Sequence, residues 1–250
     1  MTLILLLFSG AGQAVAAGIN FDNESLSYTI SYKWGLVQKD AGKATLTLKH
    51  SGNNYEIILA ARTLPWADKI FSVRDTLAAV ISKADLKPAT YIKTTHENGR
   101  YRKDVIRYTY MMNHVYGTCT RYKKNKGKLE KTVKKFSATG PTFDMLSIFY
   151  YVRSLDYNSM KPNTVKKAKL FSGSGTETLR IRNKGVEKVS VPAGKNFRCY
   201  HLVFSFTSDS GKESGVPMDV WVTADNAHIP VRFEGHLPIG KVRAFLTSAK

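Results

Sequence analysis

Histidine is the residue type best suited to acid–base catalysis or metal binding, and in this sequence the histidines are scattered. They are His50, His96, His114, His201, His228 and His236. His228 and His236 fall in one extended segment, where they would lie roughly 26 Å apart, so they cannot share a metal ion within that strand. The sequence contains no HExxH, CxxC or GxSxG motif and no phosphate-binding loop. It therefore predicts no catalytic residue, no metal site and no cofactor. It favours a protein that is not an enzyme. The lesser alternative is a hydrolase whose triad residues lie far apart in the sequence.

Aromatic side chains are the second group that could form a site, because they can line a pocket for an apolar ligand. They fall in predicted strands and in one predicted helix. The candidates for such a pocket are Trp34, Trp66, Phe149, Tyr150 and Trp221. The alternative is that these rings fill the hydrophobic core, where large aromatic residues usually lie. The sequence leaves both interpretations open.

The segment from Arg121 to Lys135 carries eight basic residues and one acidic residue, with a predicted hairpin tip at Asn125–Gly127. Its anion-binding candidates are Arg121, Lys123, Lys124, Lys126 and Lys128. Such a patch favours an anionic surface of the cell envelope as partner. Nucleic acid is not expected, because Tyr122 is the single aromatic residue in the segment that could stack on bases. The alternative is a solvated hairpin whose lysines keep an edge strand from pairing with other chains.

Residues 1–17 have the form of a secretory signal peptide. An apolar run, Leu3–Phe8, is followed by small residues and by the cleavage pattern Ala14–Ala16. The run is too short to cross a bilayer, and no later apolar run reaches the roughly eighteen residues that crossing requires. We therefore expect a periplasmic or secreted protein with no transmembrane segment. In an oxidising compartment Cys119 and Cys199 could form a disulfide, and the alternative is two buried free thiols.

The composition is that of a globular protein with an excess of positive charge. Of the 250 residues, 43% are hydrophobic and 23% are charged, which excludes collagen-like, coiled-coil and wholly disordered chains. Lys and Arg number 38 against 19 Asp and Glu, giving a formal net charge of +19. Outside the basic segment this excess is spread singly along predicted strands, as expected for the polar faces of a sheet.

Most of the chain alternates apolar and polar residues with the period of two that is typical of half-buried strands. The predicted strands are 26–34, 44–48, 55–62, 73–82, 89–97, 101–112, 115–122, 131–137, 165–171, 177–183, 187–191, 197–206, 218–223, 229–236 and 241–247. Asn98-Gly99, between two of them, predicts a tight hairpin. A short helical turn is predicted within residues 64–71.

One segment has helical spacing instead. Met145, Ile148, Phe149 and Val152 follow the i, i+3, i+4, i+7 pattern and predict a helix over residues 142–155. We expect a mainly β fold in which antiparallel sheets form a half-barrel or a two-lobed sheet, with this helix at its centre. Residues 18–250 are expected to form a single β-rich domain, and the alternative is two sheet lobes divided near 140–156.

Several motifs occur in a fixed order along the chain, namely Tyr32–Gly35, Ala41–Ala44, Asp144–Arg153, Val191–Cys199, Val220–Asp225, Ile229–Val231 and Ile239–Val242. In this order they resemble the DUF3108 domain family, whose members are exported envelope proteins of Gram-negative bacteria with no assigned activity. The resemblance covers Leu26 to Ser248, which is most of the chain. It implies an exported, mostly β protein and supplies no catalytic residue.

Taken together, these features favour an exported envelope protein without an evident catalytic site that binds an apolar or lipid-like ligand, or a protein partner in the envelope. This hypothesis predicts an apolar pocket between sheet and helix. The alternative is an adhesion or scaffold module that binds anionic envelope surfaces through the basic hairpin. That hypothesis predicts an affinity that falls steeply with salt.

Overall fold

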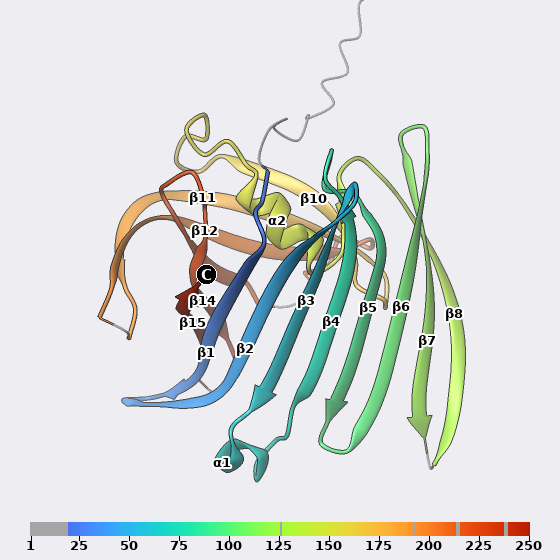
Figure 1. Ribbon diagram of the computed structural model, residues 1–250, viewed down its shortest axis with the longest axis horizontal. Coiled ribbons are helices and arrows are strands. Elements are labelled where there is room, and N and C mark those ends of the chain that lie inside the picture. Colours follow the sequence, from blue (N-terminus) through green and yellow to red (C-terminus); the bar gives the residue numbers. More distant parts are fainter. Residues whose placement is uncertain (1–19, 126, 193, 214–215, 238–239) are drawn as a thin grey trace, which may run out of the picture.

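The computed structural model describes residues 20–125, 127–192, 194–213, 216–237 and 240–250 (Figure 1). The predicted signal peptide and Lys126 lie outside these residues. The strands are β1 (Glu24–Trp34), β2 (Val37–Ser51), β3 (Asn54–Thr63), β4 (Arg74–Ser82), β5 (Pro88–Glu97), β6 (Arg100–Met111), β7 (His114–Asn125), β8 (Lys128–Thr139), β9 (Thr142–Phe143), β10 (Val165–Phe171), β11 (Thr176–Ser190), β12 (Asn196–Ser208), β13 (Met218–Thr223), β14 (Pro230–His236) and β15 (Lys241–Ala249). The helices are α1 (Pro65–Asp68) and α2 (Ser147–Arg153).

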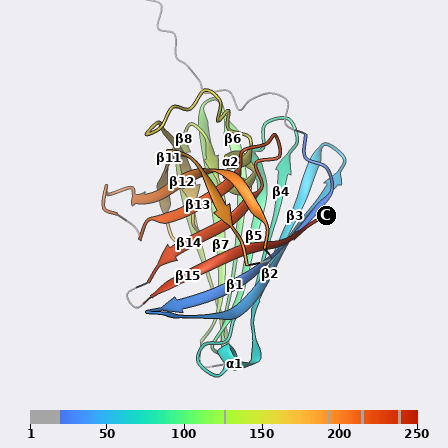
Figure 2. The ribbon, with the colours of Figure 1, turned by 90° about the vertical axis from the view of Figure 1, so that its left-hand side faces the viewer.

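The described strands form one sheet of fifteen strands that curls into a nearly closed barrel. Its order is β8-β7-β6-β5-β4-β3-β2-β1-β15-β14-β13-β12-β11-β10-β9, and neighbours are antiparallel except for β9 and β10. The prediction of a mainly β fold is confirmed. The half-barrel and the two-lobed sheet are wrong, because β1 pairs with β15 and joins the two halves of the chain into one sheet (Figure 2).

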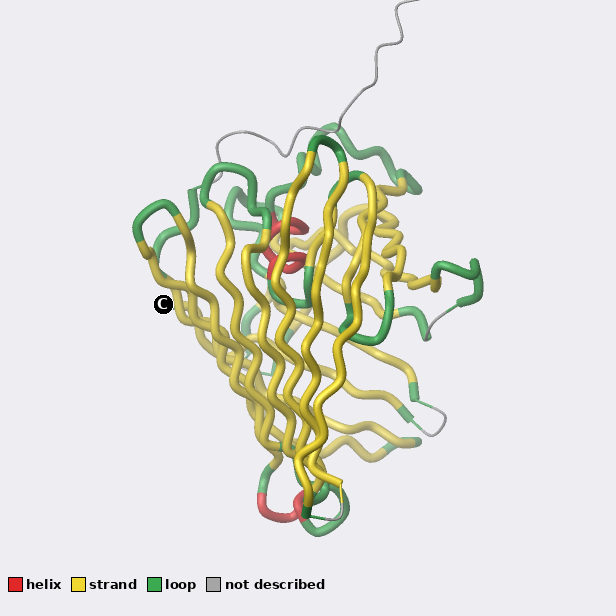
Figure 3. Tube along the Cα trace, turned by 90° about the vertical axis from the view of Figure 1, so that its right-hand side faces the viewer, coloured by secondary structure: helices red, strands yellow, loops and turns green. Residues whose placement is uncertain are grey.

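The predicted strands largely match the observed ones, because the alternation of residue types follows the two faces of the sheet. Asn98 and Gly99 both have positive φ, at 51° and 75°, as a tight primed hairpin turn requires. The predicted strands 177–183 and 187–191 are one strand, β11, with a register shift between Asn183 and Gly185. The predicted turn within 64–71 is the short helix α1, at one end of the barrel (Figure 3).

The central helix is shorter than predicted. Thr142 and Phe143 form strand β9, which pairs in parallel with β10, so the helix begins only at Ser147. The Asp144 carboxylate accepts hydrogen bonds from the backbone N–H groups of Leu146 and Ser147, at 2.8 and 2.9 Å. This local bonding satisfies donors that a longer helix would have used, and it fixes the start of α2.

Helix α2 lies inside the barrel and packs against both sides of it (Figure 1). Six of its seven residues are buried. Tyr150 belongs to a core cluster with residues of β1–β7, whereas Tyr151 and Val152 belong to a second cluster with β10–β13. A helix that is buried on all sides is an internal plug rather than an outer layer of the sheet.

The barrel is closed by side chains where the two ends of the sheet approach each other. Phe171, at the end of β10, packs against Tyr108 and Phe136 with ring centroids 5.5 Å away in each case. Its ring also lies over Gly117, where an added Cβ would stand only 2.6 Å from it. Glycine is therefore required at position 117, because any side chain would collide with the ring that closes the barrel.

Candidate functional site

An apolar cavity of about 250 Å³ lies between α2 and the surrounding barrel wall. All nineteen residues that line it are apolar or aromatic, namely Tyr28, Ile30, Ala44, Leu46, Leu59, Met145, Leu146, Ile148, Phe149, Val152, Leu170, Leu179, Phe204, Phe206, Met218, Val220, Pro230, Phe233 and Ala244. An engineered dry cavity of roughly 150 Å³ is large enough to bind benzene. This cavity is therefore large enough for an apolar group bigger than one ring.

The residues of the cavity wall follow directly from the two periodicities of the sequence. On β1, Tyr28 and Ile30 are two residues apart and point inward together. Met145, just before α2, and Ile148, Phe149 and Val152 within it form one stripe, and this stripe faces the cavity. Every element around the cavity therefore contributes apolar or aromatic side chains to its wall.

Tyr28 is the lining residue that carries a hydroxyl, and this hydroxyl is already engaged. It donates a hydrogen bond to the backbone oxygen of Pro230 at 2.9 Å. Burial raises the pKa of Tyr28 well above its ordinary value, so the side chain stays neutral. The wall therefore offers a ligand van der Waals contact, without a charge or a free hydrogen-bond donor.

Of the five aromatic residues predicted to line a pocket, the structure places Phe149 in the cavity wall and the other four elsewhere. Trp34 is 39% exposed at the end of β1. Trp66, on α1, donates its indole N–H to the Asp40 carbonyl. Tyr150 is fully buried and donates to the Glu24 carboxylate at 2.9 Å. Trp221 lies on the outside of the barrel, because alternation along β13 turns Val220 inward and its neighbour outward.

Most of the cavity wall was missed, because the prediction considered a few aromatic residues and most of the wall is aliphatic. The signal was present in the alternation of Phe204 and Phe206 on β12 and of Met218 and Val220 on β13. This pattern identifies an inward face. It does not separate a packed core from a cavity, because both are lined by the same residue types.

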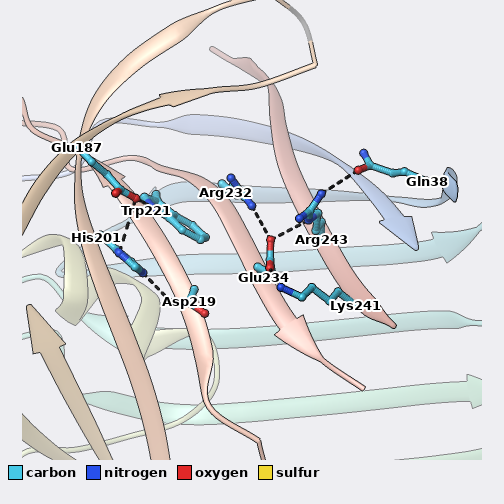
Figure 4. A network of polar contacts seen from close by, with 9 residues as sticks. All are labelled: Gln38, Glu187, His201, Asp219, Trp221, Arg232, Glu234, Lys241 and Arg243. Atoms are coloured by element: carbon cyan, nitrogen blue, oxygen red, sulfur yellow. Dashed lines mark hydrogen bonds and ion pairs between the residues drawn. The ribbon is translucent and has the colours of Figure 1, made fainter. Parts of the chain in front are cut away.

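Outside the barrel, Trp221 lies in a network of polar contacts on β11–β15 (Figure 4). Its indole N–H donates to the Glu187 carboxylate, and its ring stacks on His201 at 4.6 Å. His201 places one ring nitrogen 2.6 Å from Asp219 and the other 3.6 Å from Glu187. Because both nitrogens of His201 face carboxylates, neither is turned to a serine or cysteine nucleophile. This histidine does not form the triad that a hydrolase would need.

The same outer network contains Glu234, a buried carboxylate surrounded by cations (Figure 4). Arg232, Lys241 and Arg243 each donate a hydrogen bond to it, at 2.5, 2.7 and 2.7 Å. Burial opposes the ionisation of Glu234, but the three cationic donors outweigh it and lower its pKa to about 2. The sequence predicts a solvated strand face here, and the structure instead places a sequestered ion cluster on it.

The remaining potential ligands do not gather into a site. His50 and His228 each place a ring nitrogen against a backbone oxygen, at 2.6 and 2.7 Å. Among the described residues, no group of three or more His, Cys, Asp or Glu side chains could hold a metal ion. Cys119 and Cys199 are both buried free thiols, so the disulfide considered above is not formed. Burial raises the pKa of both thiols, that of Cys199 to about 12, which leaves them unreactive.

The basic segment forms the β7–β8 hairpin, and β8 is an edge strand of the sheet. Arg121 is not free to bind an anion, which corrects its place among the candidates. It donates two hydrogen bonds to Asp104, at 2.7 and 2.8 Å, and one to the Gly173 carbonyl at 2.9 Å. Lys123, Lys124 and Lys128 are exposed near the hairpin tip.

The fold and the cavity define a barrel-like β protein with an internal apolar space. The chain belongs to the DUF3108 family, described as a protein of unknown function, whose family model matches residues 27–247. A comparison with curated proteins found no match. Among solved structures, the chain is similar to a β-barrel-like protein of the domain of unknown function DUF1849 from Brucella abortus. The TM-score is 0.65 at 8% identity, over 93% of this chain and 99% of that one. This likeness supports the fold. Neither described helix is long and apolar enough to cross a membrane.

Proposed function

We propose that this protein is an exported, non-catalytic envelope protein that binds an apolar or lipid-like ligand inside its barrel. The observation that carries the proposal is the cavity of about 250 Å³ with an entirely apolar lining. The predicted signal peptide supports periplasmic or secreted localisation. A protein partner in the envelope could deliver or receive such a ligand.

The character of the cavity wall supports a bound apolar ligand. The lining is apolar throughout, and Met145, one of the lining residues, is exposed, so the space is open to solvent. Covering apolar surface that faces water is favourable by roughly 25 cal/mol per Å². A ligand that binds only the folded state would also stabilise it.

The proposal is tested by narrowing the cavity and measuring the affinity for a neutral apolar probe, N-phenyl-1-naphthylamine, by fluorescence. Ala244 lines the cavity, so Ala244→Phe places a ring inside it. We expect the probe to bind at least about tenfold more weakly, a loss of about 1.4 kcal/mol. The melting temperature should stay near that of the wild type, because the ring fills existing space.

The matched control is Ala249→Phe, the same change at an exposed position of the same strand. It should bind the probe as the wild type does. If Ala244→Phe fails to fold, Val220→Phe narrows the same cavity from β13. Equal affinity of the wild type and a folded cavity variant would show that the probe binds elsewhere and would remove the proposal. If the cavity variant does weaken binding, native mass spectrometry of the protein purified from its own envelope would identify the natural ligand by its mass.

A second candidate function is attachment to an anionic envelope surface through the β7–β8 hairpin. The observation in its favour is the exposure of Lys123, Lys124 and Lys128 close to the hairpin tip. The two functions are compatible, because the hairpin tip and the cavity involve different residues.

A further inference from the structure

The inner wall of the barrel changes from apolar to charged along one row of neighbouring residues. From β2 to β7 this row consists of Leu46, Leu59, Leu77, Lys93, Asp104 and Arg121, each paired with the next. Cross-strand partners point to the same face of a sheet. Because Leu46 and Leu59 line the cavity, the charged part of the row faces the same interior.

Two cations on this charged wall have hydrogen-bonding capacity to spare. Within the described part of the chain, Lys93 makes no salt bridge or side-chain hydrogen bond. The Nε–H of Arg102 is buried without a hydrogen-bond partner, and its approach to Asp104 is a loose 3.6 Å. Asp104 is shared between the two arginines, and Arg121 is its closer partner, with one hydrogen bond to each oxygen.

Other polar groups nearby do not use the free hydrogen-bonding capacity of Lys93 and Arg102. The hydroxyls of Tyr91 and Tyr108, on β5 and β6, are also buried without a partner. Lys93 has two acidic neighbours: its cross-strand partner Asp104, and Asp75, which accepts a hydrogen bond from the His96 backbone. Burial and the charge of Glu97 both raise the pKa of Asp75, so it is a weak counter-ion.

We propose that the apolar cavity and this charged wall form one site for a single-chain amphiphile with an anionic head group. The chain would occupy the cavity, and a carboxylate or phosphate head would bind Lys93 and Arg102. Leu59 and Lys93 are two strands apart, about 10 Å, so one molecule can reach both regions. The inference rests on the proposed function and adds the chemistry of the ligand's polar end.

The recognition follows from the types of the two cations. The guanidinium group of Arg102 carries several N–H donors in a fixed fork that matches carboxylate and phosphate oxygens. Lys93 supplies a second positive charge from the neighbouring strand. Charge-assisted hydrogen bonds are stronger in a partly dehydrated interior than in water, so the head group should add selectivity as well as affinity.

The test compares dodecanoate, dodecyl phosphate and dodecanol as probes by isothermal titration calorimetry with the full mature protein. The variant Lys93→Gln/Arg102→Gln removes both charges. The control Lys103→Gln lies beside Arg102 on β6, where alternation turns its side chain to the outer face. Thermal unfolding confirms that each variant is folded.

We expect the double variant to bind the anionic probe at least about tenfold more weakly, with no change for dodecanol, and Lys103→Gln to match the wild type. Tighter binding of dodecanoate or of dodecyl phosphate identifies which acid the head group carries. If the double variant retains wild-type affinity for both acids while dodecanol binds, the inference fails and the apolar site stands. If none of the three probes binds the wild type, the proposed function fails as well.

Discussion

Only one of the two carboxylate oxygens of Asp144 accepts a hydrogen bond from the described residues. One oxygen accepts the hydrogen bonds that start α2, whereas the other is buried without a partner. Burial raises the pKa of Asp144 from 3.8 to about 6, although the hydrogen bonds from Ser147 and Leu146 lower it in part. Ionising Asp144 therefore costs more in the folded protein than in the unfolded chain, although the ionised form still predominates at pH 7.

This arrangement predicts how Asp144→Asn changes the pH dependence of stability. Between about pH 4 and 6 the folded wild type holds a proton that the unfolded chain has lost, so its free energy of unfolding falls as the pH rises. The fall attributable to this group is about 3 kcal/mol. An asparagine keeps the accepting oxygen and has no charge. The variant should therefore exceed the wild type in stability at pH 7 and match it near pH 4, as measured by urea unfolding across this range.

The control is Asp144→Ala, which removes the accepting oxygen as well. It should be less stable than Asp144→Asn by about 1 kcal/mol at each pH, because the start of α2 loses its cap. A constant difference between the wild type and Asp144→Asn from pH 4 to pH 7 would contradict the prediction. That result would mean that the buried carboxylate carries no ionisation cost in the folded protein.

At the level of elements, the packing of Phe171 and the polar contacts of the loop at residues 172–175 together close the barrel, without strand pairing across the gap. Arg121 on β7 is the main link, because it binds both Asp104 and the Gly173 carbonyl. Lys134 on β8 adds a longer contact to the Ser174 carbonyl, at 3.4 Å. The carboxylate of Asp104 is almost inaccessible to water, so it depends on its cationic partner.

Arg121→Met should therefore destabilise the protein strongly. The change leaves the Asp104 charge buried with only the loose contact to Arg102, and breaking one partner of such a pair costs about 3 kcal/mol or more. Adding Asp104→Asn should restore part of this loss, because no buried charge then remains. Urea unfolding measures each step. Lys124→Met removes an exposed cation from the same strand and should change the stability by less than about 0.5 kcal/mol. Equal effects of the two methionine variants would rule out this role for Arg121.

The sequence predicts the elements well and their closure poorly. Local alternation is enough to identify strands such as Val165–Phe171 and Met218–Thr223, whose observed bounds equal the predicted ones. Closure depends on contacts between distant residues, such as Phe171 against Gly117, which leave no local periodicity. The early part of the predicted helix became β9 because Thr142 and Phe143 pair with β10, while the Asp144 carboxylate takes the N–H groups of the residues that follow.

The candidate site was predictable in kind and only partly in its residues. The helical stripe containing Phe149 predicts an apolar surface facing the sheet, and this surface does line the cavity. The tryptophans were wrongly predicted to line the cavity, because their indole N–H groups require hydrogen-bond partners that an apolar cavity lacks. Trp66 and Trp221 find those partners at a strand end and on the outer face.

At the scale of the whole molecule, the net charge of +19 favours attraction to anionic surfaces, and the β7–β8 hairpin concentrates part of it at an exposed tip. Lys124→Glu/Lys128→Glu reverses two exposed charges there. Sedimentation with vesicles containing phosphatidylglycerol should show at least about tenfold weaker binding for this variant. Wild-type binding should fall steeply as the salt concentration rises, because exposed charges are screened.

The control Lys184→Glu/Lys188→Glu makes the same change of net charge at exposed positions of β11. If both variants lose the same affinity, the attraction belongs to the overall charge and not to the hairpin. If wild-type binding is insensitive to salt, the anionic-surface function is wrong.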